Sequence, residues 1–379
     1  MANISRCRPG AVKAMKDKYM ASGPLAGVKV IEFAGLGPGP FAGMVLSDLG
    51  AEVVEIARDG APAPRATRSD ARGRKRIGLN LKTPEAVETC LSLIEKADII
   101  FEGNRPGVME RLGLGPDVML ARNPALVYGR MTGWGQYGPL AQAAGHDINY
   151  FALTGLLHAI GPEERPVPPL NLGADYGGGS MFLIAGMLSA LIHARTTGQG
   201  QVVDVAMTDC ATYLGTLFHD MRGSGDWKDQ REANLLDGGA HFYGNYECAD
   251  GKFVAIGSIE PQFYALLLEK TGAAEKLSDQ QMDRSKWPEM RETLRDIFRT
   301  RTRDEWCEIM EGTDVCFAPV LALEEVPNHP HQVARGVFVD VGGVRQVAPA
   351  PRFSGTPATV QWAPSDKQWL AEDILSEWT

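Results

Sequence analysis

The chain has 379 residues, more than one ordinary hydrophobic core supports, so its length predicts two domains. Hydrophobic residues make up 44% and charged residues 22%, as in globular proteins, and the net charge of −9 argues against a nucleic-acid partner. The longest apolar run, from Met181 to Ile192, is interrupted by Gly186 and Ser189 and predicts a core helix rather than a membrane span. We therefore expect neither a nucleic acid nor a membrane as a partner.

Six cysteines are scattered along the chain without a Cys-x-x-Cys motif or a paired spacing. Such usage is typical of buried thiols in a reducing compartment rather than of a disulfide frame or a zinc site, so no metal site is predicted. We expect a cytoplasmic protein, or a mitochondrial or peroxisomal one if the source is eukaryotic. Residues 1–22 are basic, and we expect a tail or a short surface helix there, with a weak transit-like extension as the alternative.

The folded part begins with a strand pattern at 28–33, a turn rich in glycine and proline at 34–40, a helix pattern at 41–49 and a second strand at 51–56. Strand, helix and strand in this order predict a parallel sheet. Pro38 and Pro40 are incompatible with an ordinary dinucleotide fingerprint, and Arg58 after the second strand suits a phosphate better than two free ribose hydroxyls. The start of the chain therefore predicts a site for a phosphorylated nucleotide rather than for plain NAD.

Further strands are predicted at 97–102, 125–131 and 202–206, with a long helix at 180–194, which makes a doubly wound half. The turns that contain Gly37, Arg58, Arg105 and Gly133 all follow strands, and ligands of parallel sheets bind at the carboxyl ends of strands. The arginine- and lysine-rich run at 65–76 is either a solvated loop or a contact for phosphate.

The composition of the chain changes at about Gly223, where charged residues become more frequent. Strands at 243–247 and 253–257 are joined across Asp250-Gly251, a hairpin signal, and helices are predicted at 262–271, 287–299 and 303–311. We divide the chain into a basic extension at 1–22, a large ligand-binding domain at 23–222, a small α+β domain at 223–326 and a return to the large domain at 327–379.

Two compact polar motifs are candidates for chemistry: Gly145–Tyr150, which contains His146, and the motif at 171–176, which contains Asp175 and is closed by three glycines. The intrinsic pKa of histidine, about 6.5, suits a general base. From the residues alone, His146 is equally readable as structural and Asp175 as a helix cap. We interpret Asp147 as a cap of its own helix, and His241 as a residue of the core or of a substrate pocket.

Six stretches of this sequence together resemble the α-methylacyl-CoA racemases, a branch of the family III CoA-transferase superfamily. They lie at 23–33, 37–40, 79–83, 145–150, 171–175 and 259–264. The resemblance extends over nearly the whole chain after Gly23. It implies an α/β fold with a Rossmann-like large domain, a parallel sheet and a smaller α+β domain, in an interlocked homodimer. It also implies an acyl-CoA substrate, with CoA as part of that substrate and no separate cofactor.

The resemblance assigns His146, supported by Glu260, and Asp175 as the catalytic groups. In the interlocked dimer, Glu260 could come from the other chain. The positions that it implies for contacts with the CoA thioester are Gly37, Pro38, Arg58, Leu79, Asn80, Leu81, Lys82, Asn104, Arg105, Arg111, Gly145, Asp147, Ile148, Asn149 and Tyr150.

The implied reaction interconverts R and S 2-methyl-branched acyl-CoA thioesters by a two-base 1,1-proton transfer through an enolate. The alternative within the superfamily is CoA transfer between carboxylic acids, with Asp175 as the nucleophile that forms an anhydride. A third hypothesis is a CoA-thioester binding protein without catalytic activity. The sequence does not identify the acyl chain, which bile-acid intermediates, branched fatty acids and smaller 2-methyl acids would all supply.

Overall fold

The computed structural model describes residues 22–65, 67–277 and 280–378, so the predicted basic extension lies outside them except for Ser22. The chain forms two compact units. Unit 1 contains the chain up to Tyr150, Asn171–Ala211 and the chain from Gly336 onward, and unit 2 contains Phe151–Leu170 and Thr212–Arg335. The chain thus leaves unit 1 twice and returns twice.

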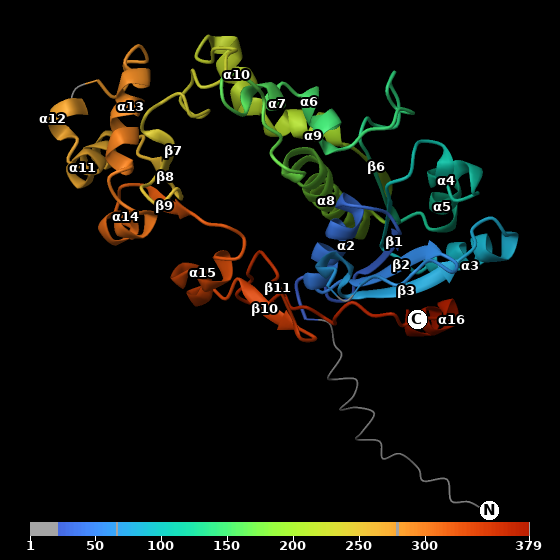
Figure 1. Cartoon of the computed structure of the whole chain (residues 1–379). Coiled ribbons are helices and arrows are strands. Elements are labelled where there is room, and N and C mark those ends of the chain that lie inside the picture. Colours follow the sequence, from blue (N-terminus) through green and yellow to red (C-terminus); the bar gives the residue numbers. More distant parts are fainter. Residues whose placement is uncertain (1–21, 66, 278–279, 379) are drawn as a thin grey trace, which may run out of the picture. The chain divides into compact units, whose positions relative to one another are not determined.

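Unit 1 is built on a six-stranded sheet in the order β3-β2-β1-β4-β5-β6 (Figure 1). Every neighbouring pair in it is parallel, which confirms the predicted parallel sheet. Strand order and direction are those of a doubly wound, Rossmann-like sheet. The strands are β1 Lys29–Phe33, β2 Glu52–Arg58, β3 Arg74–Leu79, β4 Ile99–Glu102, β5 Val127–Thr132 and β6 Gln201–Ala206.

Helices cover both faces of this sheet, because successive side chains of a strand point to opposite faces. Ile31, Val54, Ile100 and Tyr128 belong to one cluster with buried residues of α3 Pro84–Ile94, α5 Pro116–Arg122 and α16 Ala371–Glu377. On the other face, α8 Phe182–Thr197 packs so closely on β5 that a Cβ added at Gly129 would lie 2.7 Å from Met187 Sδ. The remaining elements of unit 1 are α2 Pro38–Asp48, η1 Ser69–Ala71, α4 Val108–Arg111, the start of α6 Asp147–Ala152, η2 Leu172–Met181, the start of α9 Met207–Leu214, β10 Phe338–Val341 and β11 Val344–Val347.

The helix Leu172–Thr197, which joins η2 to α8, is long and apolar enough by length and composition to cross a membrane. Half of its most apolar window is buried inside the protein, as in a core helix. The buried side chains of α8, among them Leu183, Met187 and Leu191, agree with the core helix predicted from the sequence.

β3 is a strand that the sequence pattern did not predict. It contains half of the basic residues of the run at 65–76. Arg72 and Arg74 are buried and pair with Asp48 and Glu32 at 2.5 Å each. Lys75 and Arg76, the next two residues, have Glu52 and Glu55 as partners, at 3.8 and 3.7 Å. These cations therefore neutralise carboxylates of unit 1 and are not phosphate ligands in a solvated loop.

Unit 2 contains an antiparallel sheet in the order β7-β8-β9, with bounds Tyr243–Glu247, Phe253–Gly257 and Phe317–Val320, which confirms the predicted hairpin and adds a third strand. Its core cluster includes Phe242, Tyr246, Leu267, Phe298 and Trp306. The helices of unit 2 are α7 Leu156–Ala159, α10 Thr216–Ser224, α11 Pro261–Thr271, α12 Ala274–Leu277, α13 Trp287–Phe298, α14 Arg303–Met310, η3 Val326–Asn328 and α15 Pro330–Ala334.

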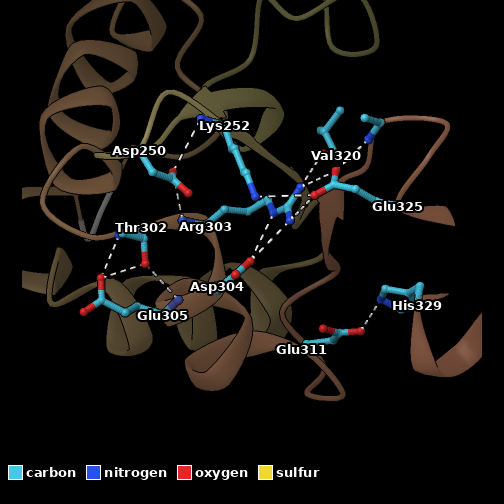
Figure 2. A network of polar contacts seen from close by, with 11 residues as sticks. Asp250, Lys252, Thr302, Arg303, Asp304, Glu305, Glu311, Val320, Glu325 and His329 are labelled. Carbon is cyan, nitrogen blue, oxygen red and sulfur yellow. Dashed lines mark hydrogen bonds and ion pairs between the residues drawn. The ribbon is translucent and has the colours of Figure 1, made fainter.

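A polar network fastens the end of β9 to the start of α14 (Figure 2). The guanidinium of Arg303 donates to both oxygens of Glu325, at 2.9 and 2.8 Å, and to the Val320 carbonyl at 3.2 Å. Thr302 and Glu305 form a capping box at the same helix end. Bidentate arginine–carboxylate geometry is specific as well as strong, so this network fixes the segment that follows β9.

Candidate active site

The predicted CoA-contact residues of the first half of the chain gather at one edge of the six-stranded sheet. Parallel pairing places the carboxyl ends of the strands together, and Arg58 and Leu79 are register partners at the ends of β2 and β3. Gly37 follows β1, and Asn104 and Arg105 follow β4. Because β1 lies between β2 and β4, the turns after β1 and β4 mark the point where the strand order reverses, which is where ligands of such sheets bind.

Four cationic side chains at this edge lack carboxylate partners. Arg58, Lys82, Arg105 and Arg111 are exposed, and within residues 22–65, 67–277 and 280–378 none of them forms an ion pair. In the basic run, by contrast, ion pairs are formed by Arg68, Arg72, Arg74, Lys75 and Arg76, and within the described residues Arg65 forms none. The four unpaired cations at the carboxyl ends of the strands are therefore available to an anionic ligand such as a phosphate.

His146 stands at the beginning of α6, and its backbone is fixed on both sides. Its amide donates to Asn149 Oδ1 at 3.0 Å, and its carbonyl accepts from the amides of Asn149 and Tyr150, at 2.8 and 3.2 Å. The side chain itself is exposed. The polar residue three positions after His146 thus holds the helix start and leaves the imidazole free to meet a ligand.

Asp175 lies inside a helix rather than before one, which corrects its interpretation as a cap. Leu172–Met181 is a π-helix that continues into α8, and π-helical turns are rare and occur at functional sites. Burial raises the pKa of the Asp175 carboxyl, and the nearby charge of Asp147 raises it further. A hydrogen bond from the Asn171 side chain and the charge of His146 act in the opposite direction. Partial burial and the charge of Asp147 thus outweigh these two effects, and the pKa of Asp175 is raised.

His146, Asp175 and Gly37 are brought together from three separate segments. His146 and Asp175 are close enough for the charge of the ring to act on the carboxyl pKa. A Cβ built on Gly37 would lie 3.7 Å from Asp175 Oδ2, and Gly37 has a φ of 65°, where glycine is favoured. The turn after β1 therefore runs directly beside the Asp175 carboxylate.

Ser180 joins this turn to the π-helix. Its buried hydroxyl is within hydrogen-bond distance of the Pro38 carbonyl, at 2.8 Å, and of the Asp175 carbonyl, at 3.3 Å. Gly178 and Gly179 have no room for a side chain, because an added Cβ would lie 2.9 Å from the Ala211 amide nitrogen and 3.1 Å from Met131 Sδ. The glycine run after Asp175 thus serves close packing of the helix that carries it.

Asp147 does not cap its own helix, contrary to the prediction. Its Oδ1 accepts the amides of Ala174 and Asp175, at 2.9 and 2.7 Å, in the π-helix. Sequence reasoning missed this role and that of Ser180 toward Pro38, since partners 27 or more positions apart leave no local signal. Its only trace in the sequence is that an aspartate adjoins the candidate base.

The ring of Tyr150 packs against Gly133, Trp134 and Gly145. Its ring is perpendicular to Trp134, with centroids 4.8 Å apart, and its hydroxyl donates to the Gly145 carbonyl. A Cβ on Gly133 would lie 2.0 Å from Tyr150 Cε1 and one on Gly145 would lie 2.6 Å from it. Both glycines are therefore required by the position of this ring. Ile148, also in the motif, is 44% exposed.

Glu260 belongs to unit 2, whereas His146 and Asp175 belong to unit 1, so its pairing with His146 stays a prediction. Glu260 is exposed and precedes α11, and its side chain does not cap that helix. The segment before it is held by Gln281, whose Nε2 donates to the carbonyls of Ser258 and Ile259 at 3.1 and 2.8 Å. His241 lies in the core of unit 2, bonded to the Tyr264 hydroxyl at 2.8 Å, and burial lowers its pKa to about 4.

The chain belongs to CoA-transferase family III, whose family model matches residues 25–366. It is 46% identical to a mouse protein and 42% identical to a human protein, each named alpha-methylacyl-CoA racemase, over 88% of this chain and 87% of each relative. It is also 30% identical to Rv3272 of Mycobacterium tuberculosis, named a probable fatty acyl-CoA transferase, over 84% of this chain and 88% of that protein. The crystal structure of Rv3272 has a TM-score of 0.76 and 27% identity, covering 91% of this chain and 97% of that one.

Proposed function

We propose that this protein is an α-methylacyl-CoA racemase that interconverts R and S 2-methyl-branched acyl-CoA thioesters without a separate cofactor. The observation that supports this most directly is the convergence of His146 and Asp175, two groups able to transfer protons, beside the turn at Gly37. The two mammalian relatives at 42–46% identity bear the name of this activity.

The reaction follows from one group on each face of the thioester α-carbon. The neutral imidazole of His146 takes the α-proton and becomes imidazolium, and the electron pair of the C–H bond moves into the enolate. A protonated Asp175 then returns a proton to the opposite face and is left as a carboxylate. In the reverse direction the carboxylate of Asp175 takes the proton and the imidazolium of His146 delivers one. Each positioned proton-transfer group contributes roughly 10²–10⁴-fold to the rate.

The raised pKa of Asp175 suits both of its roles. A carboxyl at its ordinary pKa of about 3.9 is almost wholly ionised near pH 7 and is a weak base. Burial and the charge of Asp147 raise the pKa of Asp175, which strengthens the carboxylate as a base and increases the protonated fraction that acts as the acid. Dipoles directed at the enolate oxygen would supply much of the remaining stabilisation.

Deuterium exchange tests this proposal. Each pure enantiomer is incubated in deuterated water with wild type, His146→Ala or Asp175→Asn, and incorporation at the α-carbon and racemisation are both followed. We expect each variant to lose exchange unequally for the two enantiomers, and in opposite senses. The exposed residues His193 and Asp117 supply the control variants His193→Ala and Asp117→Asn, which should match wild type. Wild type that neither exchanges nor racemises either enantiomer would falsify the proposal.

The transferase alternative is supported by the similarity to Rv3272 and by the same carboxylate. Attack of Asp175 on the thioester would form an acyl anhydride and release the CoA thiolate, and His146 would have no required role. Trapping with hydroxylamine or borohydride distinguishes the two reactions, since a modified Asp175 is expected only for transfer. A CoA-thioester binding protein would show neither exchange nor trapping, and its biological effect would survive both substitutions.

We also propose a homodimer in which Glu260 of one chain supports His146. Co-expression of His146→Ala with Glu260→Gln, each carrying a different tag, tests whether Glu260 acts across the dimer. If it does, the doubly tagged species contains one intact site and recovers about half of the wild-type activity per dimer. If both groups come from the same chain, the mixed species stays inactive. Size-exclusion chromatography with light scattering checks the dimer itself.

A further inference from the structure

The side chain of Asp147 ties together the two segments that carry His146 and Asp175. Asp147 follows His146 directly, and its carboxylate is 6% exposed. Oδ1 accepts the Ala174 amide at 2.9 Å and the Asp175 amide at 2.7 Å. These partners are 27 and 28 positions further along the chain, so the link is tertiary and not part of a local turn.

The two amides belong to the start of the π-helix, where amides have no partner within the helix. Asn171, at the cap position, offers no side-chain cap to the backbone. Asp147 therefore caps this helix from a different segment. A carboxylate that accepts amide bonds is held more tightly and at a better-defined distance than a neutral acceptor, because the bonds are charge-assisted.

The buried carboxylate is only half satisfied. Within the described part of the chain, Oδ2 of Asp147 is buried and has no hydrogen-bond partner, and no arginine or lysine forms an ion pair with Asp147. A buried charge in this condition is costly and is not retained for stability alone. Its charge acts on its neighbour, whose pKa it raises.

We propose that Asp147 is a positioning residue, which sets the distance between His146 and Asp175 and holds a second carboxylate beside that of Asp175. The proposal rests on the proposed racemase function. Besides Asp147, the groups that act on Asp175 are the His146 ring and the Asn171 amide, while Tyr150 is influenced by both Asp175 and Arg105.

Two substitutions separate geometry from charge. Asp147→Ala removes the acceptor of both amides, and we expect kcat to fall by about 100-fold in both directions with little change in KM, since a misplacement of about 1 Å between reacting groups has an effect of this size. Asp147→Asn keeps an oxygen that can accept the amides but removes the charge. We expect it to lose less kcat than Asp147→Ala.

The pH profile gives the readout that a merely structural cap would not change. In the direction where Asp175 is the base, the rate falls as the pH drops through the pKa of Asp175. Removal of the neighbouring negative charge lowers that pKa, so the acid limb of Asp147→Asn should move to lower pH. This direction is identified by the enantiomer whose exchange Asp175→Asn abolishes. Asp117→Asn, which removes an exposed first-turn carboxylate from α5, is the control and should leave kcat and the profile unchanged.

The outcomes are distinguishable. If wild type shows exchange and both Asp147 variants keep the wild-type kcat, the positioning role is overturned. The racemase proposal is then unaffected. An unmoved acid limb in Asp147→Asn, with a lower Tm and activity lost only in proportion to unfolded protein, also overturns it and identifies Asp147 as a structural cap. Absence of exchange in wild type contradicts the racemase proposal itself. Asp147→Asn keeps the size and an acceptor, so it carries the test if Asp147→Ala does not fold.

Discussion

Unit 1 holds two kinds of buried carboxylate, and they are neutralised in different ways. Glu32 in β1 and Asp48 in α2 are 1% and 4% exposed. Glu32 pairs with the buried Arg74, and Asp48 pairs with the buried Arg72. At the candidate site, the buried Asp147 is held by backbone amides, and its charge raises the pKa of another carboxyl, that of Asp175.

The pKa values follow this difference in surroundings. Burial raises the pKa of Glu32 to about 7, and Arg74 acts against that rise. Burial also raises the pKa of Asp175, but Asp147 adds to the rise. Arginine thus lowers the pKa of the buried carboxyl that it pairs with, whereas a second carboxylate raises the pKa of its neighbour. A raised pKa is one feature of groups that transfer protons.

The largest expected effect comes from removal of the arginine on the structural side. Arg74→Met leaves Glu32 without its partner and also frees the Pro40 and Asp70 carbonyls that Arg74 binds. We expect the free energy of unfolding to fall by about 3–5 kcal/mol, as for other broken buried pairs. Urea unfolding measures this change.

The control is the double substitution of Glu32 and Arg74 by methionine. It removes the stranded charge, so we expect it to recover much of the lost stability. A loss of unfolding free energy of less than about 1 kcal/mol in Arg74→Met would be far smaller than the cost of an uncompensated buried charge. Such a result would contradict the structural role of this pair.

A smaller effect is expected from Gly37→Ala, which disturbs the site without altering its charges. The φ of 65° at Gly37 is strained for alanine, at about 1–3 kcal/mol, and the added Cβ lies 3.7 Å from Asp175 Oδ2. We expect racemisation to be reduced more strongly than stability, measured as kcat/KM and Tm on the same sample. Gly39→Ala is the matched control in the same turn, because its added Cβ meets no atom within 4 Å. Equal losses in the two variants would argue against a special position of Gly37.

The smallest effect is expected at Glu325, a partly exposed carboxylate that pairs with the buried Arg303. The hydrogen bond from Arg303 lowers the pKa of Glu325 to about 2, assisted by the Ala322 amide. Because the folded pKa lies below the unfolded value of about 4.3, this pair stabilises unit 2 above pH 4.3, and the contribution is lost as the pH falls toward 2. Wild type should therefore unfold at higher urea than Glu325→Gln at pH 6, and the two should converge in acid. Curves that stay apart at pH 2 would point to a cause other than this ionisation.

Much of the sheet was predictable from the sequence, because buried parallel strands such as 28–33 and 97–102 are short apolar runs bounded by turns. The long core helix and the hairpin at Asp250-Gly251 were predicted for similarly local reasons. β3 was missed because its cations appear as a charged loop in the sequence, and only the tertiary structure shows that Arg74 is buried against Glu32 of β1. The apolar stretch at 151–158 is not one helix, because α6 ends at Ala152 and Gly155, with a φ of 81°, precedes α7.

By itself, the sequence determined the layers of the fold and the motifs that contain His146 and Asp175, since apolar periodicity, glycine turns and the identity of a catalytic side chain are local properties. Only the tertiary structure decided what surrounds these groups. It placed Asp175 inside a π-helix, set Gly37 beside its carboxylate and turned the Asp147 side chain toward the amides of Ala174 and Asp175. The physical reason is that the pKa and the orientation of a side chain depend on burial and on neighbours that are close in space but distant in the chain.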